Sequence, residues 1–183
     1  MAWITKKSST AAPSTDADHQ GDYLTGDMKQ DLTDRYLPRF ETKHAALLPA
    51  LHMIQHHYGW VPEQAMLEIA TFLELPPAEV IDTATFYEEY WTKPKGQHVV
   101  AVCRSIACEF CGQPEITEAC KAKLGVDVGE TTDDDSFTLI ELECLGSCGT
   151  APVALIDETL HENLKPGDMA GLIDEVKQNS GGH

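Results

Sequence analysis

The chain has 183 residues, a formal net charge of −17 and 42% hydrophobic residues. This length suits one ordinary domain, or a small domain with an appendage. The acidic charge argues against a nucleic-acid partner, which would require a basic surface. No apolar run is long enough to span a membrane, and the first residues lack the apolar core of a secretory signal. We therefore expect a cytoplasmic protein with no direct membrane insertion, where reducing conditions favour metal or redox roles for cysteine.

The first 30 residues mix Ser, Thr, Ala, Pro, Asp and Gly with few apolar residues. Such a segment has little apolar surface to bury, so residues 1–30 are expected to form a disordered or loosely attached tail.

Residues 31–95 show helical periodicity. Apolar residues recur at intervals of three and four over 43–58, and Gly59 ends this run. Similar spacing predicts a second helix over 61–73 and a third over 77–90. Three short helices with brief connections indicate a small helical bundle.

After residue 95 the pattern changes to alternating strands and helices. The expected elements are strand 98–103, a cysteine loop, helix 113–124, acidic loop 127–135, strand 137–143, a second cysteine loop, strand 153–156, a turn or strand at 159–164, and helix 166–178. This order is typical of an α/β fold with helices packed on a mixed sheet. Residues 96–178 should form this domain, and 179–183 should fray.

Two close pairs of cysteines stand out, Cys103 with Cys108 and Cys144 with Cys148. Each pair follows a predicted strand, so a rigid sheet can hold the loop that carries it. Glycines near each pair allow the backbone to turn without a clashing Cβ. Two short-spaced pairs are what a four-thiolate metal site needs, and we predict an iron–sulfur site.

Spacing alone leaves two ligand sets open. One is formed by the two pairs. The other uses Cys103-x₄-Cys108-x₂-Cys111 with one distant cysteine, which is the spacing of plant-type ferredoxins. The sixth cysteine, Cys120, falls inside a predicted helix and is interpreted as an ordinary buried thiol.

Zinc is the main alternative metal. Cysteines in zinc sites usually have two to four intervening residues, which fits the pair at 144 and 148 and places the pair at 103 and 108 at the edge of the range. A redox dithiol at Cys108 and Cys111 is a weaker alternative.

Several motifs between Arg35 and Val176 together carry a resemblance to a known family. They are Leu47–Leu51, Gln55–Pro62, Ala84–Tyr87, Pro94–Gly96, Cys103-x₄-Cys108-x₃-Gly112, Gly129–Thr132 and Glu143–Pro152. On these residues the chain resembles the small [2Fe–2S] subunit, known as the E subunit, of the NADH-oxidising module of respiratory complex I. Asp135 departs from the family, which commonly has Gly there, and Cys111 is an additional thiol near the cluster loop.

The resemblance implies a thioredoxin-like [2Fe–2S] ferredoxin domain preceded by a small helical bundle. It implies one [2Fe–2S] cluster with its ligands at Cys103, Cys108, Cys144 and Cys148. It also implies an electron-transfer subunit of NADH:quinone oxidoreductase, in the peripheral arm of a membrane complex, whose flavin-binding partner subunit carries FMN and NADH. The chain lacks a Gly-x-Gly-x-x-Gly or P-loop motif, in keeping with nucleotide binding by the partner and with no side-chain catalysis here.

Other functions remain open at this point. Small subunits of NAD-linked formate dehydrogenases and hydrogenases are similar to this chain. A zinc-stapled structural adaptor would need the same cysteines. A free-standing ferredoxin is disfavoured by the helical extension, whose aromatic residues, such as Phe86 and Tyr87, are expected to serve as core and as a docking surface for the flavin subunit.

Overall fold

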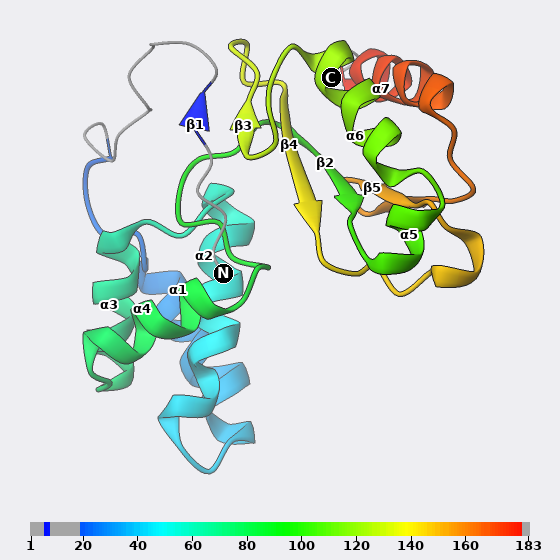
Figure 1. Ribbon diagram of the computed structural model, residues 1–183. Coiled ribbons are helices and arrows are strands. Elements are labelled where there is room, and N and C mark those ends of the chain that lie inside the picture. Colours follow the sequence, from blue (N-terminus) through cyan, green and yellow to red (C-terminus); the bar gives the residue numbers. More distant parts are fainter. Residues whose placement is uncertain (1–5, 8–18, 181–183) are drawn as a thin grey trace. The chain divides into compact units, whose positions relative to one another are not determined.

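The computed structural model describes residues 6–7 and 19–180 (Figure 1). These residues fall into two compact units, one formed by 19–94 and one by 95–180 together with 6–7. The remaining residues of the two expected tails, 1–5, 8–18 and 181–183, lie outside the described part of the chain. Within that described part, no helix has both the length and the apolar character needed to cross a bilayer.

The first unit is helical. Its α-helices are α1 (Gly26–Asp31), α2 (Leu47–Tyr58), α3 (Glu63–Leu73) and α4 (Pro77–Phe86), with short π and 3-10 turns between α1 and α2. Each of the three longer helices buries one apolar stripe, including Leu51, Ile69 and Val80, in a shared core. The periodic spacing in the sequence therefore predicted the three longer helices of the bundle, but not α1.

The expectation of a disordered tail up to residue 30 is wrong for residues 19–30. Leu24 is fully buried and Tyr23 nearly so, both in the core of the bundle. The backbone N–H of Leu24 donates to Glu68 Oε2 over 2.7 Å, and Thr25 caps α1 by accepting from the N–H of Met28. Two apolar side chains within a polar stretch are too few for a periodic pattern, yet they suffice to anchor it.

Helix α4, which the sequence predicted to run from 77 to 90, ends earlier, at Phe86. The chain leaves the helix at Tyr87 and turns back on the bundle, where Tyr90 is buried and its hydroxyl donates to the Leu48 carbonyl over 3.2 Å. The N–H of Trp91 donates to Gln55 Oε1 over 2.8 Å. These contacts replace the last helical turn that the sequence predicted.

The second unit contains a mixed sheet in the order β1-β3-β4-β2-β5-β6. The strands are β1 (Lys6–Lys7), β2 (His98–Cys103), β3 (Glu130–Thr131), β4 (Phe137–Leu142), β5 (Ala154–Ile156) and β6 (Thr159–His161). The central strands β2 and β4 are parallel, and β5 runs antiparallel to β2. The expected acidic loop 127–135 contains β3, whose two residues are too short for a sequence pattern.

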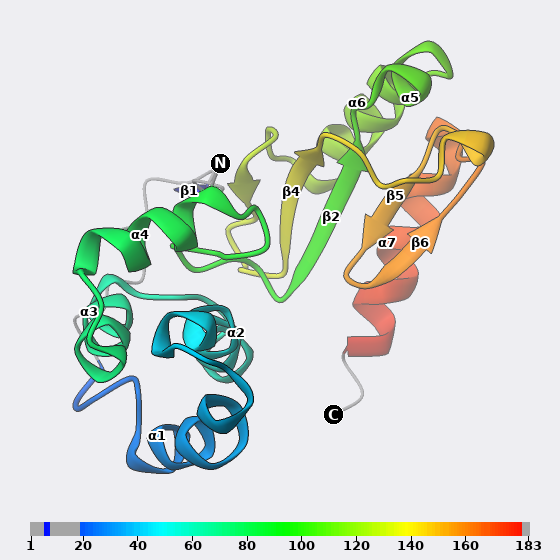
Figure 2. The same ribbon diagram turned by 90° about the horizontal axis from the view of Figure 1, so that it is seen from below.

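Two helices, α6 (Gln113–Leu124) and α7 (Pro166–Ser180), cover one face of this sheet. A short helix, α5 (Ile106–Phe110), precedes α6. Apolar residues of α6 and α7, such as Ile116 and Ile173, pack with alternate residues of the central strands, such as Val100 and Leu139. Figure 2 shows α7 running beside β5 and β6. The packed helices fix the sheet whose strand ends carry the cysteines.

Candidate metal centre

The two cysteine loops leave the same edge of the sheet. Cys103 is the last residue of β2, and Cys144 follows shortly after the end of β4. These strands are parallel neighbours, and Cys103 lies opposite Leu142 in their register. Because the carboxyl ends of parallel strands meet at one edge, cysteines that are far apart in the sequence are brought to adjacent loops.

Cys103 and Cys108 form the buried half of the site. They are 2% and 1% exposed, in a small apolar cluster with Val153. Burial raises the pKa of the Cys108 thiol to about 11, a backbone hydrogen bond with Val153 lowers it, and nearby Cys103 and Cys148 raise it further. A thiol with this pKa stays protonated at neutral pH, so a metal must displace its proton to bind.

Cys144 and Cys148 form the exposed half of the site. The backbone N–H of Gly146 donates to the Cys144 sulfur over 3.3 Å. Gly146 has φ +75°, a conformation that glycine adopts without strain and that lets the loop turn its N–H toward the sulfur. N–H···S hydrogen bonds of this kind tune the reduction potential of thiolate-bound iron.

The structure therefore brings Cys108 close to Cys103 and Cys148, and holds Cys144 in the same loop as Cys148. All four are free thiols. No three Cys, His, Asp or Glu side chains among the described residues already form a group that could hold a single metal ion. A [2Fe–2S] cluster has two irons that share four thiolates, so two ligands per iron suffice.

Two polar networks support the loops. In the first, Gln113 and Thr117 of α6 bond to Glu141 of β4. In the second, Ser147 and Thr150 of the second cysteine loop bond to Glu162, which follows β6. Each network joins residues that are 12 to 28 positions apart, so no short motif marks it and reasoning from the sequence missed both.

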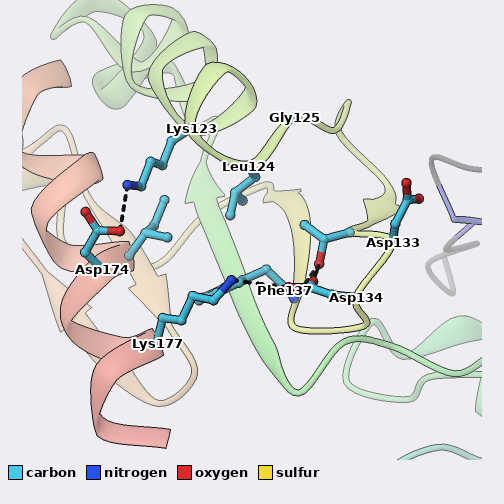
Figure 3. A pocket seen from close by; sticks show the side chains of 10 residues that line it. Lys123, Leu124, Gly125, Asp133, Asp134, Phe137, Asp174 and Lys177 are labelled. Carbon is cyan, nitrogen blue, oxygen red and sulfur yellow. Dashed lines mark hydrogen bonds and ion pairs between the residues drawn. The ribbon is translucent and has the colours of Figure 1, made fainter. Parts of the chain in front are cut away.

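A pocket of about 400 Å³ lies away from the cysteines, between α6, α7 and the turn before β4 (Figure 3). Its two lysines already have acidic partners. Lys123 Nζ lies 2.6 Å from Asp174, and Lys177 Nζ lies 3.2 Å from Asp134. The charged residues of this pocket therefore form ion pairs that link α7 to α6 and to the turn before β4. The cysteine loops remain the candidate site.

Comparison with known proteins identifies the family. The family model of the thioredoxin-like [2Fe–2S] ferredoxins matches residues 33–177. The chain belongs to this family. Its expected fold class is thereby confirmed: an α/β, thioredoxin-like [2Fe–2S] ferredoxin domain, preceded in this structure by a small helical bundle.

Similar curated proteins are E subunits of NADH-quinone oxidoreductase. The chain is 38% identical to the one from Rickettsia bellii over 82% of this chain and 89% of the relative. It is 35% identical to the one from Escherichia coli K12, over 81% and 90%. It is 32% identical to the one from Pseudomonas aeruginosa, over 83% and 92%. The resemblance predicted from sequence motifs is confirmed.

Solved structures of an NAD⁺-reducing [NiFe]-hydrogenase are also similar. The H₂-reduced state matches with a TM-score of 0.63 and 26% identity over 73% of this chain. The air-oxidised state matches with a TM-score of 0.64 and 25% identity. The chain spans only 22% of the hydrogenase chain in the first case and 23% in the second.

The residues present fit the iron–sulfur cluster of this ferredoxin family. Four free thiols, two of them buried and one accepting an N–H···S bond, are the donor set that such a cluster requires. The other two cysteines differ sharply from each other. Cys111 is exposed at the end of α5, whereas Cys120 is fully buried in α6, where burial raises the pKa of its thiol to about 12.

Proposed function

We propose that this chain is the electron-transfer subunit of the NADH-oxidising module of an NADH:quinone oxidoreductase. In this proposal, Cys103, Cys108, Cys144 and Cys148 hold one [2Fe–2S] cluster. The observation that carries it is the pairing of two cysteine loops at one edge of the parallel strands β2 and β4, in a member of the [2Fe–2S] ferredoxin family. When bound, the cluster would supply one-electron transfer without bond making or breaking.

The chain's own residues would bind the cluster and restrict water. Buried Cys103 and Cys108 lie against Val153, with Leu145 and Ala151 packed on the same group of side chains. This apolar wall lowers the local dielectric and strengthens the effect of nearby N–H dipoles and charges. The loop of Cys144 and Cys148 remains exposed and is the side from which a partner could approach.

FMN and NADH would belong to a flavin-binding partner subunit. The complex would be cytoplasmic, in the peripheral arm of a membrane-bound assembly. We assign docking to residues 31–95 and cluster binding to 96–178. In the bundle, Phe86 and Tyr87 are 72% and 44% exposed and their rings stack edge to face, whereas Tyr90 and Trp91 are buried. Exposed aromatic pairs of this kind are enriched at protein interfaces.

A spectrum of the purified full chain tests cluster binding. A brown protein with a one-electron EPR signal after dithionite reduction supports the proposal. We expect the signal to be lost in Cys103→Ser and Cys148→Ser and retained in Cys111→Ser and Cys120→Ser. A colourless protein with bound zinc would instead support a structural adaptor.

Binding to the flavin subunit tests the docking role. Phe86→Ala and Tyr87→Ala should weaken binding, while Leu67→Ala, which removes a 43% exposed side chain of α3, should not. If all three variants bind the flavin subunit as tightly as the wild type does, Phe86 and Tyr87 are not part of the docking surface.

An equivalent role in a hydrogenase or formate dehydrogenase is the second candidate. The hydrogenase structures support this candidate because their fold is similar, at 25–26% sequence identity. The NADH-quinone oxidoreductase relatives are 32–38% identical and match over most of their length, so we favour the quinone oxidoreductase. Co-purification of the native complex, followed by assay with quinone, formate or hydrogen, separates the three.

A further inference from the structure

A carboxylate from a separate segment holds the second cysteine loop. Glu162 Oε1 lies 2.6 Å from Ser147 Oγ and 2.5 Å from Thr150 Oγ1. The two hydroxyl oxygens are 2.7 Å apart. Thr150 Oγ1 also lies 3.2 Å from the Ser147 carbonyl oxygen, so two hydroxyl hydrogens are shared among four oxygens. A carboxylate, which has no hydrogen to offer, must be an acceptor in this arrangement. Ser147 immediately precedes the proposed ligand Cys148.

The backbone fixes Glu162 in this position. The N–H of Asn163 donates to the Thr150 carbonyl over 2.8 Å, and the N–H of Leu164 donates to the Pro152 carbonyl over 3.1 Å. Both bonds join the residues just after Glu162 to the residues just after Cys148. The carboxylate is therefore held against the loop by a short stretch of paired backbone as well as by its own side chain.

Glu162 also brings a negative charge to the loop. Hydrogen bonds from Ser147 and Thr150 lower the pKa of its carboxyl, which keeps it ionised at neutral pH. No ion pair with Lys, Arg or His is found for Glu162 within the described residues. A negative charge near an iron–sulfur cluster disfavours its reduced form.

We propose that Glu162 is a positioning residue for the cluster, which shapes the Ser147–Thr150 turn around Cys148 and whose charge lowers the midpoint potential. This inference rests on the proposed function, because it requires a cluster on Cys148. The Glu162 side chain thus has two separable effects, one through its hydrogen bonds and one through its charge.

Two substitutions separate these effects. Glu162→Gln keeps a side-chain oxygen that accepts from both hydroxyls but removes the charge. Glu162→Ala removes both. The matched control is Glu158→Gln, which removes an exposed carboxylate from the turn between β5 and β6. Four residues of extended chain separate Glu158 from Glu162, which corresponds to about 13 Å. This distance exceeds the electrostatic screening length of about 8 Å at physiological salt.

The full-length chain is loaded with its cluster, and two quantities are measured. Optical redox titration gives the midpoint potential, and the rate of iron transfer to a chelator reports cluster retention. We expect a more positive potential in both Glu162 variants, with iron release at the wild-type rate in Glu162→Gln. In Glu162→Ala, release should be about tenfold faster, the usual scale for loss of an outer-shell support. Glu158→Gln should match the wild type in both.

The inference is overturned if Glu162→Gln shifts the potential no more than Glu158→Gln does and Glu162→Ala releases iron at the wild-type rate. If Glu162→Ala does not fold, Thr150→Val, which deletes one hydroxyl donor, provides the release measurement. The spectrum of the wild-type chain alone reports on the proposed function. A cluster-free wild type refutes both proposals, whereas a normal wild type with unresponsive variants refutes only this one.

Discussion

Gln113 Nε2 lies 2.7 Å from Oε1 of Glu141, which joins the first turn of α6 to the end of β4. Thr117 Oγ1 bonds to the same carboxylate oxygen over 2.9 Å. Gln113 and Thr117 are each only 6% exposed. Because α6 follows the first cysteine loop and β4 precedes the second, this network links the segments that adjoin the two loops.

Glu141→Ala should destabilise the fold by about 1–3 kcal/mol, because two nearly buried donors lose this acceptor. Among the described residues, Gln113 Nε2 then keeps only its 2.6 Å bond to Thr117 Oγ1. The control is Glu143→Ala, since the Glu143 side chain is 77% exposed and its contact with Arg104 is long, at 3.8 Å. Its effect should stay within about 0.5 kcal/mol. Urea unfolding of the cluster-free chain, analysed with a common slope, measures both. Equal midpoints for the two variants would contradict a supporting role for Glu141.

The six cysteines should differ in their reactivity toward iodoacetamide. In the cluster-loaded chain we expect modification of Cys111, which is exposed, and no modification of Cys120, which is buried with a raised thiol pKa. Removing iron with a chelator should expose Cys144 and Cys148 to rapid modification as well. Mass spectrometry of the labelled peptides assigns each site. Protection of Cys111 together with labelling of Cys144 or Cys148 in the loaded chain would show that Cys111 is a ligand.

The sequence predicted much of the fold, because strand ends, helical periodicity and cysteine spacing are local signals. It placed β2 at residues 98–103 and α6 at 113–124, as observed. It did not predict the roles of Glu141 and Glu162, because their partners come from distant segments. It also missed the anchoring of Tyr23 and Leu24, two buried side chains in a polar stretch.

The backbone conformation of Asp135 explains why the related proteins commonly have Gly at this position. Its φ is +55°, in the left-handed region that glycine adopts most easily and that Asp tolerates better than most residues. The turn is therefore formed with Asp in the position that favours Gly. The departure leaves the turn intact because the conformation, and not the residue type, is what the turn requires.

Gly96, which stands shortly before β2, packs closely against the start of β4. A Cβ at this position would lie 2.7 Å from the carbonyl carbon of Phe137 and 2.9 Å from its nitrogen. The N–H of Gly96 donates to Thr138 Oγ1 over 2.7 Å, so the chain cannot move away without losing a buried bond. Gly96→Ala should therefore destabilise the fold by about 1–3 kcal/mol.

Gly171→Ala is the control with the opposite expected sign. Gly171 lies within α7, and a Cβ there meets no atom within 4 Å. Alanine should stabilise the helix by about 0.5–1 kcal/mol, because glycine loses more backbone entropy on folding. Thermal unfolding of both variants gives the comparison. A neutral Gly96→Ala would mean that the contact with Phe137 relaxes at little cost.

The acidic turn before β4 should make stability depend on pH through Asp134. Thr132 Oγ1 donates to Asp134 Oδ1 over 2.6 Å, the Ser136 N–H donates to the same oxygen over 3.1 Å, and Lys177 Nζ lies 3.2 Å from Oδ2. These bonds, with that from Thr132 the strongest, hold the pKa of the carboxyl well below its ordinary value. A carboxyl whose pKa is lower in the folded state stabilises that state above its unfolded pKa, near 4, and progressively less as the pH falls below it.

Asp134→Asn should thus destabilise the chain at pH 7 by about 0.5–1 kcal/mol, a modest value because the Asp134 side chain is 53% exposed. The difference from the wild type should shrink below about pH 4, where the wild-type carboxyl begins to bind protons. Glu175→Gln, an exposed change on α7, should show neither effect. Urea midpoints measured between about pH 3 and pH 7 test this, on either side of the ordinary carboxyl pKa. A difference that grows as the pH falls would refute the assigned direction of the pKa shift, since only a lowered pKa makes the ionised carboxylate the form that favours folding.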